Sequence, residues 1–261
     1  EKGIPQKKQA AGFAANALPF LKRGYRTDCH ILKAPMSEVL AAAKKSNSSP
    51  AAVLVPLVSM ALRKHINPKA KNKNVRCSVV IDCRTPMGFQ TMHNCIISKN
   101  ITYVDRYDTM DFARVSTIYR SLLDLAVQKE NIVKAATEFV DTVGPLVSIK
   151  PRFLQKALAK VVFGVMKHSE CNFVFTYLGK IDLPDEVMSG LADFNFRSWP
   201  DFSECNVAAI DFDGTLILNI CENFQDKNII PDLIELCSTV GIHFETVDVL
   251  PFEQANLRLT I

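Results

Sequence analysis

Stretches in which every second residue is apolar predict the strands of this protein, because successive side chains of a strand point to opposite faces. The clearest stretch is 75–84, where β-branched residues and cysteine predominate. One face of that strand would carry four apolar side chains, namely Cys77, Val79, Ile81 and Cys83. The other segments predicted as strands are 26–34, 95–97, 171–178, 192–199 and the two arms of 206–219.

Apolar residues three or four positions apart predict helices between these strands. The helix expected at 50–66 is apolar nearly all round, so we expect it to be buried, with residues 47–50 capping its start. Ser37 is the expected N-cap of a helix at 35–45. The remaining helices are expected at 108–128 (with Ile118, Leu122, Leu125 and Ala126 as apolar stripe), 131–143, 152–168 and 231–240. This alternation predicts an α/β fold, a mixed β-sheet with helices packed on one face.

The dipeptide Asp213-Gly214 predicts a two-residue type I′ turn within 206–219. Pairing across this turn sets Ile210 against Ile217, Ala209 against Leu218 and Val207 against Ile220. The same segment also resembles the first signature of the haloacid dehalogenase phosphatases, in which Asp211 would be the nucleophile and Asp213 the acid/base with magnesium. That chemistry needs further residues on later strands, and only 50 residues follow Asp211. We therefore prefer the hairpin and keep the phosphatase as an alternative.

Charged residues at the end of the strand at 75–84 predict a structural brace. Asp82 and Arg84 would project from one face, about 7 Å apart along the strand. Opposite charges at that spacing can pair and hold the irregular loop at 85–88, and Asn94 precedes the next strand.

A strand ending in Asp-x-Arg, a loop of some ten residues and then Asn before another strand resembles the second half of the chloramphenicol acetyltransferase-like superfamily. That superfamily includes alcohol acyltransferases and the condensation domains of peptide synthetases. The strand ended by Gly179 resembles a further part of that half. The resemblance implies a C-terminal lobe at 27–261, preceded by a linker or irregular arm at 1–26. It also implies that Asp82 and Arg84 brace a substrate tunnel and that Asn94 positions its loop.

The catalytic signature of that superfamily, His-His-x-x-x-Asp-Gly, is absent from the sequence. Where the resemblance would place it, Cys221 and Glu222 stand at the histidines and Asp226 at the aspartate. Acyl transfer needs a neutral imidazole to take a proton from the attacking alcohol or amine, and a glutamate is a weak base at neutral pH. We read these three residues as a degenerate motif and expect the catalytic histidine in an N-terminal lobe of the same protein.

The resemblance thus implies an acyltransferase that moves an acyl group from acyl-CoA or a carrier-protein thioester to an alcohol or amine. Acyl-CoA would be a co-substrate, and no covalently bound cofactor is expected. This chain alone would be inactive, so a non-catalytic binding or structural module is a second possibility. Among the five histidines, His93 is the one expected near the tunnel, because it adjoins Asn94, although a structural role suits it better.

Composition narrows the remaining possibilities. The net charge is only +4, which gives no indication of nucleic-acid binding. The longest apolar stretch, 51–62, is about half of a membrane span and contains Pro56. The eight cysteines include no Cys-x-x-Cys pair, so we expect free buried thiols, no metal site and a cytoplasmic location. Residue 1 is Glu, and we expect the chain to be part of a longer protein.

Overall fold

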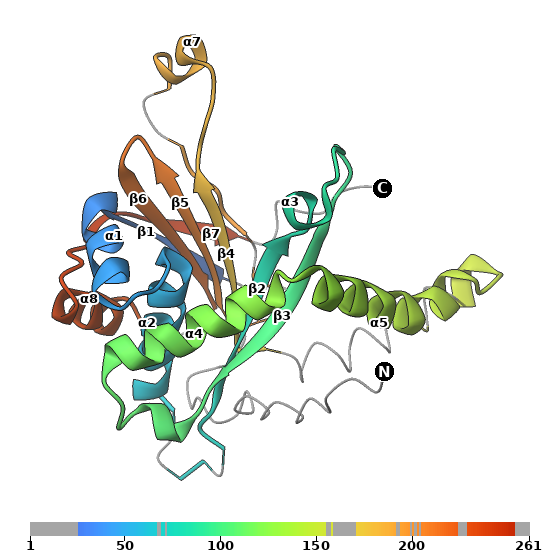
Figure 1. Ribbon diagram of the computed structural model, residues 1–261, viewed down its shortest axis with the longest axis horizontal. Helices are drawn as coiled ribbons and strands as arrows, with labels where there is room; N and C mark the ends of the chain where they lie inside the picture. Colours follow the sequence, from blue (N-terminus) through green and yellow to red (C-terminus); the bar gives the residue numbers. More distant parts are fainter. Residues whose placement is uncertain are drawn as a thin grey trace.

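A single mixed sheet organises the part of the chain that the computed structural model describes. The described residues are 26–66, 69, 70, 72–154, 158, 171–191, 194–198, 200, 203, 205–223 and 229–253. Their strands are β1 (Arg26–Pro35), β2 (Val75–Asp82), β3 (Ile96–Tyr103), β4 (Phe173–Lys180), β5 (Cys205–Phe212), β6 (Thr215–Glu222) and β7 (Glu245–Glu253). They form a sheet in the order β3-β2-β4-β5-β6-β1-β7 (Figure 1). β4 is parallel to both β2 and β5, and the other neighbours are antiparallel.

The hairpin between β5 and β6 forms as the sequence predicts. Asp213 and Gly214 have φ angles of 48° and 74°, as a type I′ turn requires. The three predicted residue pairs, Ile210 with Ile217, Ala209 with Leu218 and Val207 with Ile220, are all present. The hairpin lies at the centre of the sheet, and its strands are buried almost throughout.

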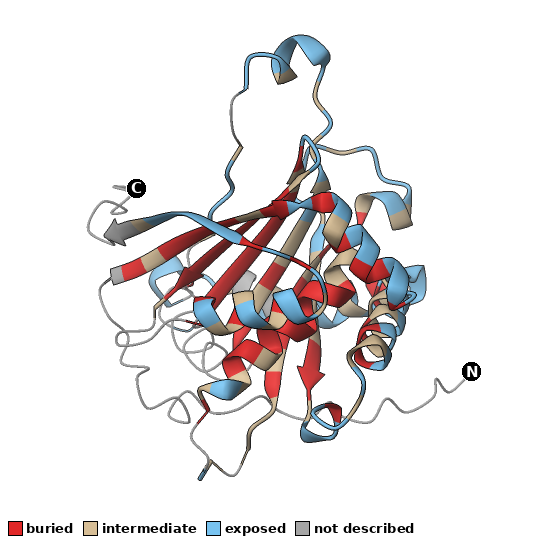
Figure 2. Ribbon diagram, turned by 90° about the vertical axis from the view of Figure 1, so that its left-hand side faces the viewer, coloured by how far each residue is buried: buried red, intermediate tan, exposed pale blue. Residues whose placement is uncertain are grey.

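Helices cover one face of the sheet, which confirms the predicted architecture (Figures 1 and 2). The main ones are α1 (Met36–Lys45), α2 (Pro50–Lys64), α4 (Phe112–Ala126) and α8 (Ile230–Thr239). α2 is the innermost, with ten buried residues, because its sequence is apolar nearly all round. Its first turn is capped by the Ser49 hydroxyl, which accepts a hydrogen bond from the Ala52 amide at 3.4 Å. The helix α5 (Lys129–Val147) is longer; it lies against β3 and extends past the sheet (Figure 1).

The opposite face of the sheet carries a smaller apolar cluster of Ile31, Ile210, Phe212 and Ile217. Residues from 181–194, which include the short α7 (Asp185–Met188), pack against it. A disulfide joins Cys29 to Cys221, directly opposite each other on β1 and β6. The prediction that the cysteines are free thiols is therefore wrong for this pair, because two strands distant in sequence bring their sulfur atoms together.

Three local predictions are wrong, two at strand ends and one for a whole strand. Ser37 lies inside α1, because β1 runs straight into this helix and the Met36 amide donates to the Gly214 carbonyl at 2.8 Å instead. Gly179 does not end β4: the strand continues to Lys180 through an irregularity between Tyr177 and Gly179, whose φ is +74°. Residues 194–198 form no strand, and the Phe194 ring stacks on Phe212 instead.

Two helix predictions also need correction. Of the apolar stripe predicted for α4, Ala126 is buried and Ile118 and Leu122 pack against the core, whereas Leu125 is half exposed. Val115 and Tyr119 are buried as well. The helix predicted at 131–143 is longer and contains Pro145. Residues 1–25, and most of the helix predicted at 152–168, lie outside the described residues.

Replacing Gly214 by alanine should lower the free energy of unfolding by about 1–2 kcal/mol, since an L-residue is strained at left-handed φ. An added Cβ would meet nothing within 4 Å there, so the cost is purely conformational. Urea denaturation of the variant measures it. Gly190→Ala is the matched control, because its Cβ would make only an ordinary 3.6 Å contact and its φ lies outside the left-handed region. Equal destabilisation by both substitutions would contradict the prediction.

Candidate functional site

The Asp82–Arg84 pair expected from the sequence is present at the end of β2. Asp82 Oδ1 accepts a hydrogen bond from the Arg84 backbone amide at 2.9 Å, and Oδ2 accepts one from Arg84 Nη1 at 2.9 Å. These contacts, the backbone one foremost, hold the pKa of Asp82 below its ordinary value. Arg84 does not continue the strand, however. It begins the one-turn helix α3 (Arg84–Met87), which replaces the irregular loop that we expected at 85–88.

Arg84 also holds the segment that leads to β3. Its Nε donates to the Thr91 carbonyl at 3.1 Å, and its Nη2 donates to the His93 carbonyl at 3.0 Å. His93 thus contributes its backbone, and its exposed imidazole is not part of these contacts. Arg84 therefore fixes the segment in which Asn94 lies.

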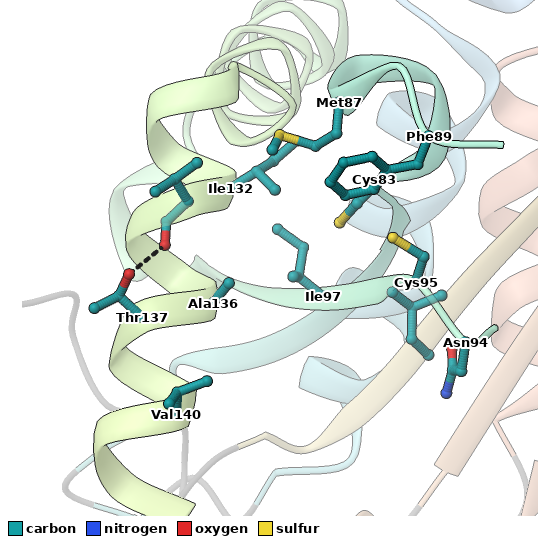
Figure 3. A pocket seen from close by; sticks show the side chains of 12 residues that line it. Cys83, Met87, Phe89, Asn94, Cys95, Ile97, Ile132, Ala136, Thr137 and Val140 are labelled. Atoms are coloured by element: carbon teal, nitrogen blue, oxygen red, sulfur yellow. Dashed lines mark hydrogen bonds between the residues drawn. The ribbon is translucent and has the colours of Figure 1, made fainter. Parts of the chain in front are cut away.

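An apolar pocket of about 480 Å³ lies beside this brace (Figure 3). α3 and the start of β3 form one side, and α5 forms the other. Its floor is buried or half-buried, and its rim is exposed. The lining residues are Cys83, Met87, Phe89, Asn94, Cys95, Ile96, Ile97, Ile132, Val133, Ala136, Thr137 and Val140. Asn94 is thus a predicted site residue that lines this pocket, and the stretch from Cys83 to Ile97 borders it.

Few polar groups face this pocket. The Thr137 hydroxyl donates to the Val133 carbonyl at 2.9 Å within α5, and Figure 3 draws this bond. Cys83 and Cys95 extend the ladder of β2 and β3, where the Cys83 amide donates to the Cys95 carbonyl at 2.9 Å. The pKa of the Cys83 thiol is raised, mainly because the thiol is buried, so this sulfur is neutral at physiological pH. The lining contains no charged side chain.

The other predicted site residues lie elsewhere. Gly179 is on β4, parallel to β2, and does not line the pocket. Cys221 and Glu222 end β6, with the Cys221 sulfur in the disulfide and Glu222 only 2% exposed. Asp226 lies outside the described residues.

A histidine that sequence reasoning did not connect with Glu222 contacts it in the fold. His30 Nε2 lies 3.1 Å from Glu222 Oε1, on the helix-covered face of the antiparallel pair β1–β6. The Ile229 amide, just before α8, also approaches Glu222 Oε2 at 3.5 Å. Burial raises the pKa of Glu222, and the hydrogen bond from His30 opposes that rise. Both side chains are buried, so the pair holds β1, β6 and α8 together and is closed to a bulky substrate.

The phosphatase-like motif is accounted for by the hairpin. Asp211 lies near the end of β5, and Asp213 is the first of the two central residues of the type I′ turn. In the described part of the chain, no three or more His, Cys, Asp or Glu side chains gather as a group that could hold a metal ion. No helix there is long and apolar enough to span a membrane.

Comparison of sequences gives no match to a protein-family model or to a curated protein. Comparison of structures does give matches. The nonribosomal peptide synthetase FmoA3 matches with a TM-score of 0.57 and 12% identity, over 89% of this chain and 22% of that one. The trichothecene 15-O-acetyltransferase TRI3 from Fusarium sporotrichioides matches with a TM-score of 0.51 and 12% identity, over 87% of this chain and 51% of that one. The condensation domain that mediates chain release from the enacyloxin polyketide synthase matches with a TM-score of 0.50 and 13% identity, over 82% of this chain and 40% of that one.

These likenesses establish the fold. The described part of this chain shares its fold, a mixed sheet with helices on one face, with part of each of these structures, as the resemblance in its sequence implied. It spans at most about half the length of the structures that it matches here.

Replacing Arg84 by alanine should loosen the segment at 88–95 while leaving the sheet intact. The side chain makes two hydrogen bonds to this segment and one to Asp82. Loss of such charge-assisted bonds on a partly exposed group should lower the free energy of local opening by about 1–2 kcal/mol, which corresponds to roughly tenfold faster amide exchange. Hydrogen exchange with mass spectrometry measures this. Arg120→Ala, which removes another arginine–aspartate pair on α4, should leave this segment unchanged. Unaltered exchange at 88–95 in Arg84→Ala would refute the brace.

Glu222→Gln should change how stability depends on pH. Because the folded-state pKa of Glu222 is raised above 4.5, the folded protein binds the extra proton, and stability falls as pH rises from about 4.5 through the folded pKa. The slope for one proton is about 1.4 kcal/mol per pH unit. Glutamine keeps the shape and removes this fall, which urea denaturation between pH 4.5 and 8 would measure. Glu235→Gln, at an exposed position, should retain the fall of stability with pH. An unchanged slope in Glu222→Gln would contradict the assignment of this fall to Glu222.

Proposed function

We propose that this chain is the C-terminal lobe of an acyltransferase that moves an acyl group from coenzyme A or a carrier-protein thioester to an alcohol or amine. The observation that carries the proposal is the fold, a seven-stranded mixed sheet with helices on one face that matches a condensation domain and an acetyltransferase. The chain spans 40% and 51% of those two structures, as one lobe of a two-lobed protein would.

The chemistry at the end of β6 supports a division of labour between lobes. The reaction needs a neutral base that can reach the attacking hydroxyl or amine. Cys221 is bridged to Cys29, and Glu222 is buried against His30, so neither presents such a base. We therefore place the proton-accepting imidazole in a preceding lobe with the signature His-His-x-x-x-Asp-Gly.

The contribution of this lobe would be a wall of the substrate tunnel. The pocket between α3, β3 and α5 supplies an apolar surface, and the Asp82–Arg84 brace fixes the segment that forms one side of it. Fixing such a wall helps catalysis by orienting the bound substrate, so this role acts through position and involves no proton transfer. As an isolated module the lobe would bind substrate without turning it over.

The test compares the 261-residue chain with the longer protein expressed from its reading frame. Release of free coenzyme A thiol from acetyl-CoA or a longer acyl-CoA, with alcohols and amines as acceptors, reports transfer. We expect no release by the 261 residues alone, and release by the longer protein that is abolished when the second histidine of the upstream signature becomes alanine. Arg84→Ala in the longer protein should lower turnover, and Arg120→Ala should not.

Two results would overturn the proposal. One is a longer reading frame that carries no such histidine signature. The other is release of coenzyme A by the 261 residues alone that is lost in His30→Ala.

A further inference from the structure

The pocket beside the brace has the chemistry of a site for a hydrocarbon chain. Its walls are aliphatic, aromatic and thiol side chains, and no charged group lines it. The Thr137 hydroxyl is already bonded to the Val133 carbonyl, which leaves the Asn94 carboxamide as the main polar side chain that can serve a ligand. A charged or strongly polar ligand would therefore lose hydrogen bonds to water without replacing them.

The shape of the pocket favours an extended ligand. In Figure 3 the α5 residues Ile132, Ala136 and Val140 lie on one side, Phe89 and Cys95 lie on the other, and Ile97 lies between them. Asn94 stands at one end, next to Cys95. A volume of about 480 Å³ is within the range of small-molecule sites, roughly 300–1,000 Å³.

We propose that this pocket binds the aliphatic tail of a medium- or long-chain acyl thioester, with the Asn94 carboxamide donating to the thioester carbonyl. This inference rests on the proposed function, and it adds the class of acyl group that the lobe selects. Removal of methylene groups from water is the driving force, so affinity should rise up to about fourfold for each methylene that enters.

The two thiols of the pocket provide a direct readout. Cys83 is buried in the floor, whereas Cys95 is half-buried on the wall, where a small electrophile can reach it. A chain that lies in the pocket would shield Cys95. Cys171 has a similar exposure and does not line the pocket, so it is an internal control in the same molecule.

The experiment measures the rate at which N-ethylmaleimide labels Cys95 and Cys171 in the 261-residue chain, by peptide mass spectrometry. The probes are the acetyl, hexanoyl and decanoyl thioesters of N-acetylcysteamine at one concentration. We expect the decanoyl thioester to slow labelling of Cys95 most and the acetyl thioester least, with Cys171 unaffected. Equal protection by all three probes, or equal protection of both cysteines, would overturn the proposal.

Variants on α5 and at Asn94 separate pocket binding from other causes. Ala136→Phe fills the pocket from an exposed helical position, so it should abolish protection of Cys95. Ala135→Phe, an identical substitution at a neighbouring position that does not line the pocket, should retain it. Asn94→Ala should weaken binding of all three thioesters by a similar factor, since it removes a contact to the group that they share. Protection that persists in Ala136→Phe would refute the pocket assignment.

Failure here is distinguishable from failure of the proposed function. Protection of Cys95 by the decanoyl thioester with no acyl transfer by the longer protein would keep the pocket and remove the transferase. Transfer by the longer protein with no protection of Cys95 would keep the transferase and remove this pocket.

Discussion

The candidate site depends on the hydrogen bonds that the guanidinium group of Arg84 donates. This group joins the last residue of β2 to the segment that leads into β3, through Asp82 and the carbonyls of Thr91 and His93. Its donors are spread over three nitrogens in fixed directions and so reach three separate acceptors, whereas the three donors of a lysine share one nitrogen. Backbone hydrogen bonds hold the two ends of this segment, at Phe89 and at Cys95, and the Arg84 side chain holds the part between them.

The pairing of β1 with β6 is the second organising feature. It places Cys29 opposite Cys221 on one face of the sheet and His30 beside Glu222 on the other. At the position where the resemblance would place the signature, these contacts form a structural junction between two strands and α8. A histidine–carboxylate pair is often catalytic, but burial decides the matter here, since both side chains are almost inaccessible.

The fold and the pocket together suggest how the lobe would serve a larger protein. A rigid sheet with a buried α2 supports the helix-covered face, and α5 extends from the sheet with Phe139 and Val140 exposed. Functional sites are more exact when rigid elements hold them, and the pocket joins a strand, a one-turn helix and α5. In the proposed enzyme this lobe would select the acyl group, and a second lobe would supply the base.

The sequence by itself determined the elements whose signals are local. The Asp213-Gly214 turn fixes the register of β5 and β6, because left-handed φ angles at these two positions allow few other turns. Ser49 and Pro50 start α2, because capping depends on neighbouring residues alone. The Asp82–Arg84 contact also followed from spacing, although Arg84 proved to begin a helix.

Only the tertiary structure decided which distant residues meet. His30 and Glu222 are 192 positions apart, as are Cys29 and Cys221, and no periodicity encodes the pairing of β1 with β6. The pocket likewise needs α5 packed against β3, and the helical pattern of α5 did not reveal which partner its apolar stripe would meet. Local preferences act between neighbours in the chain, whereas these contacts arise from the burial of whole faces, which depends on the assembled sheet.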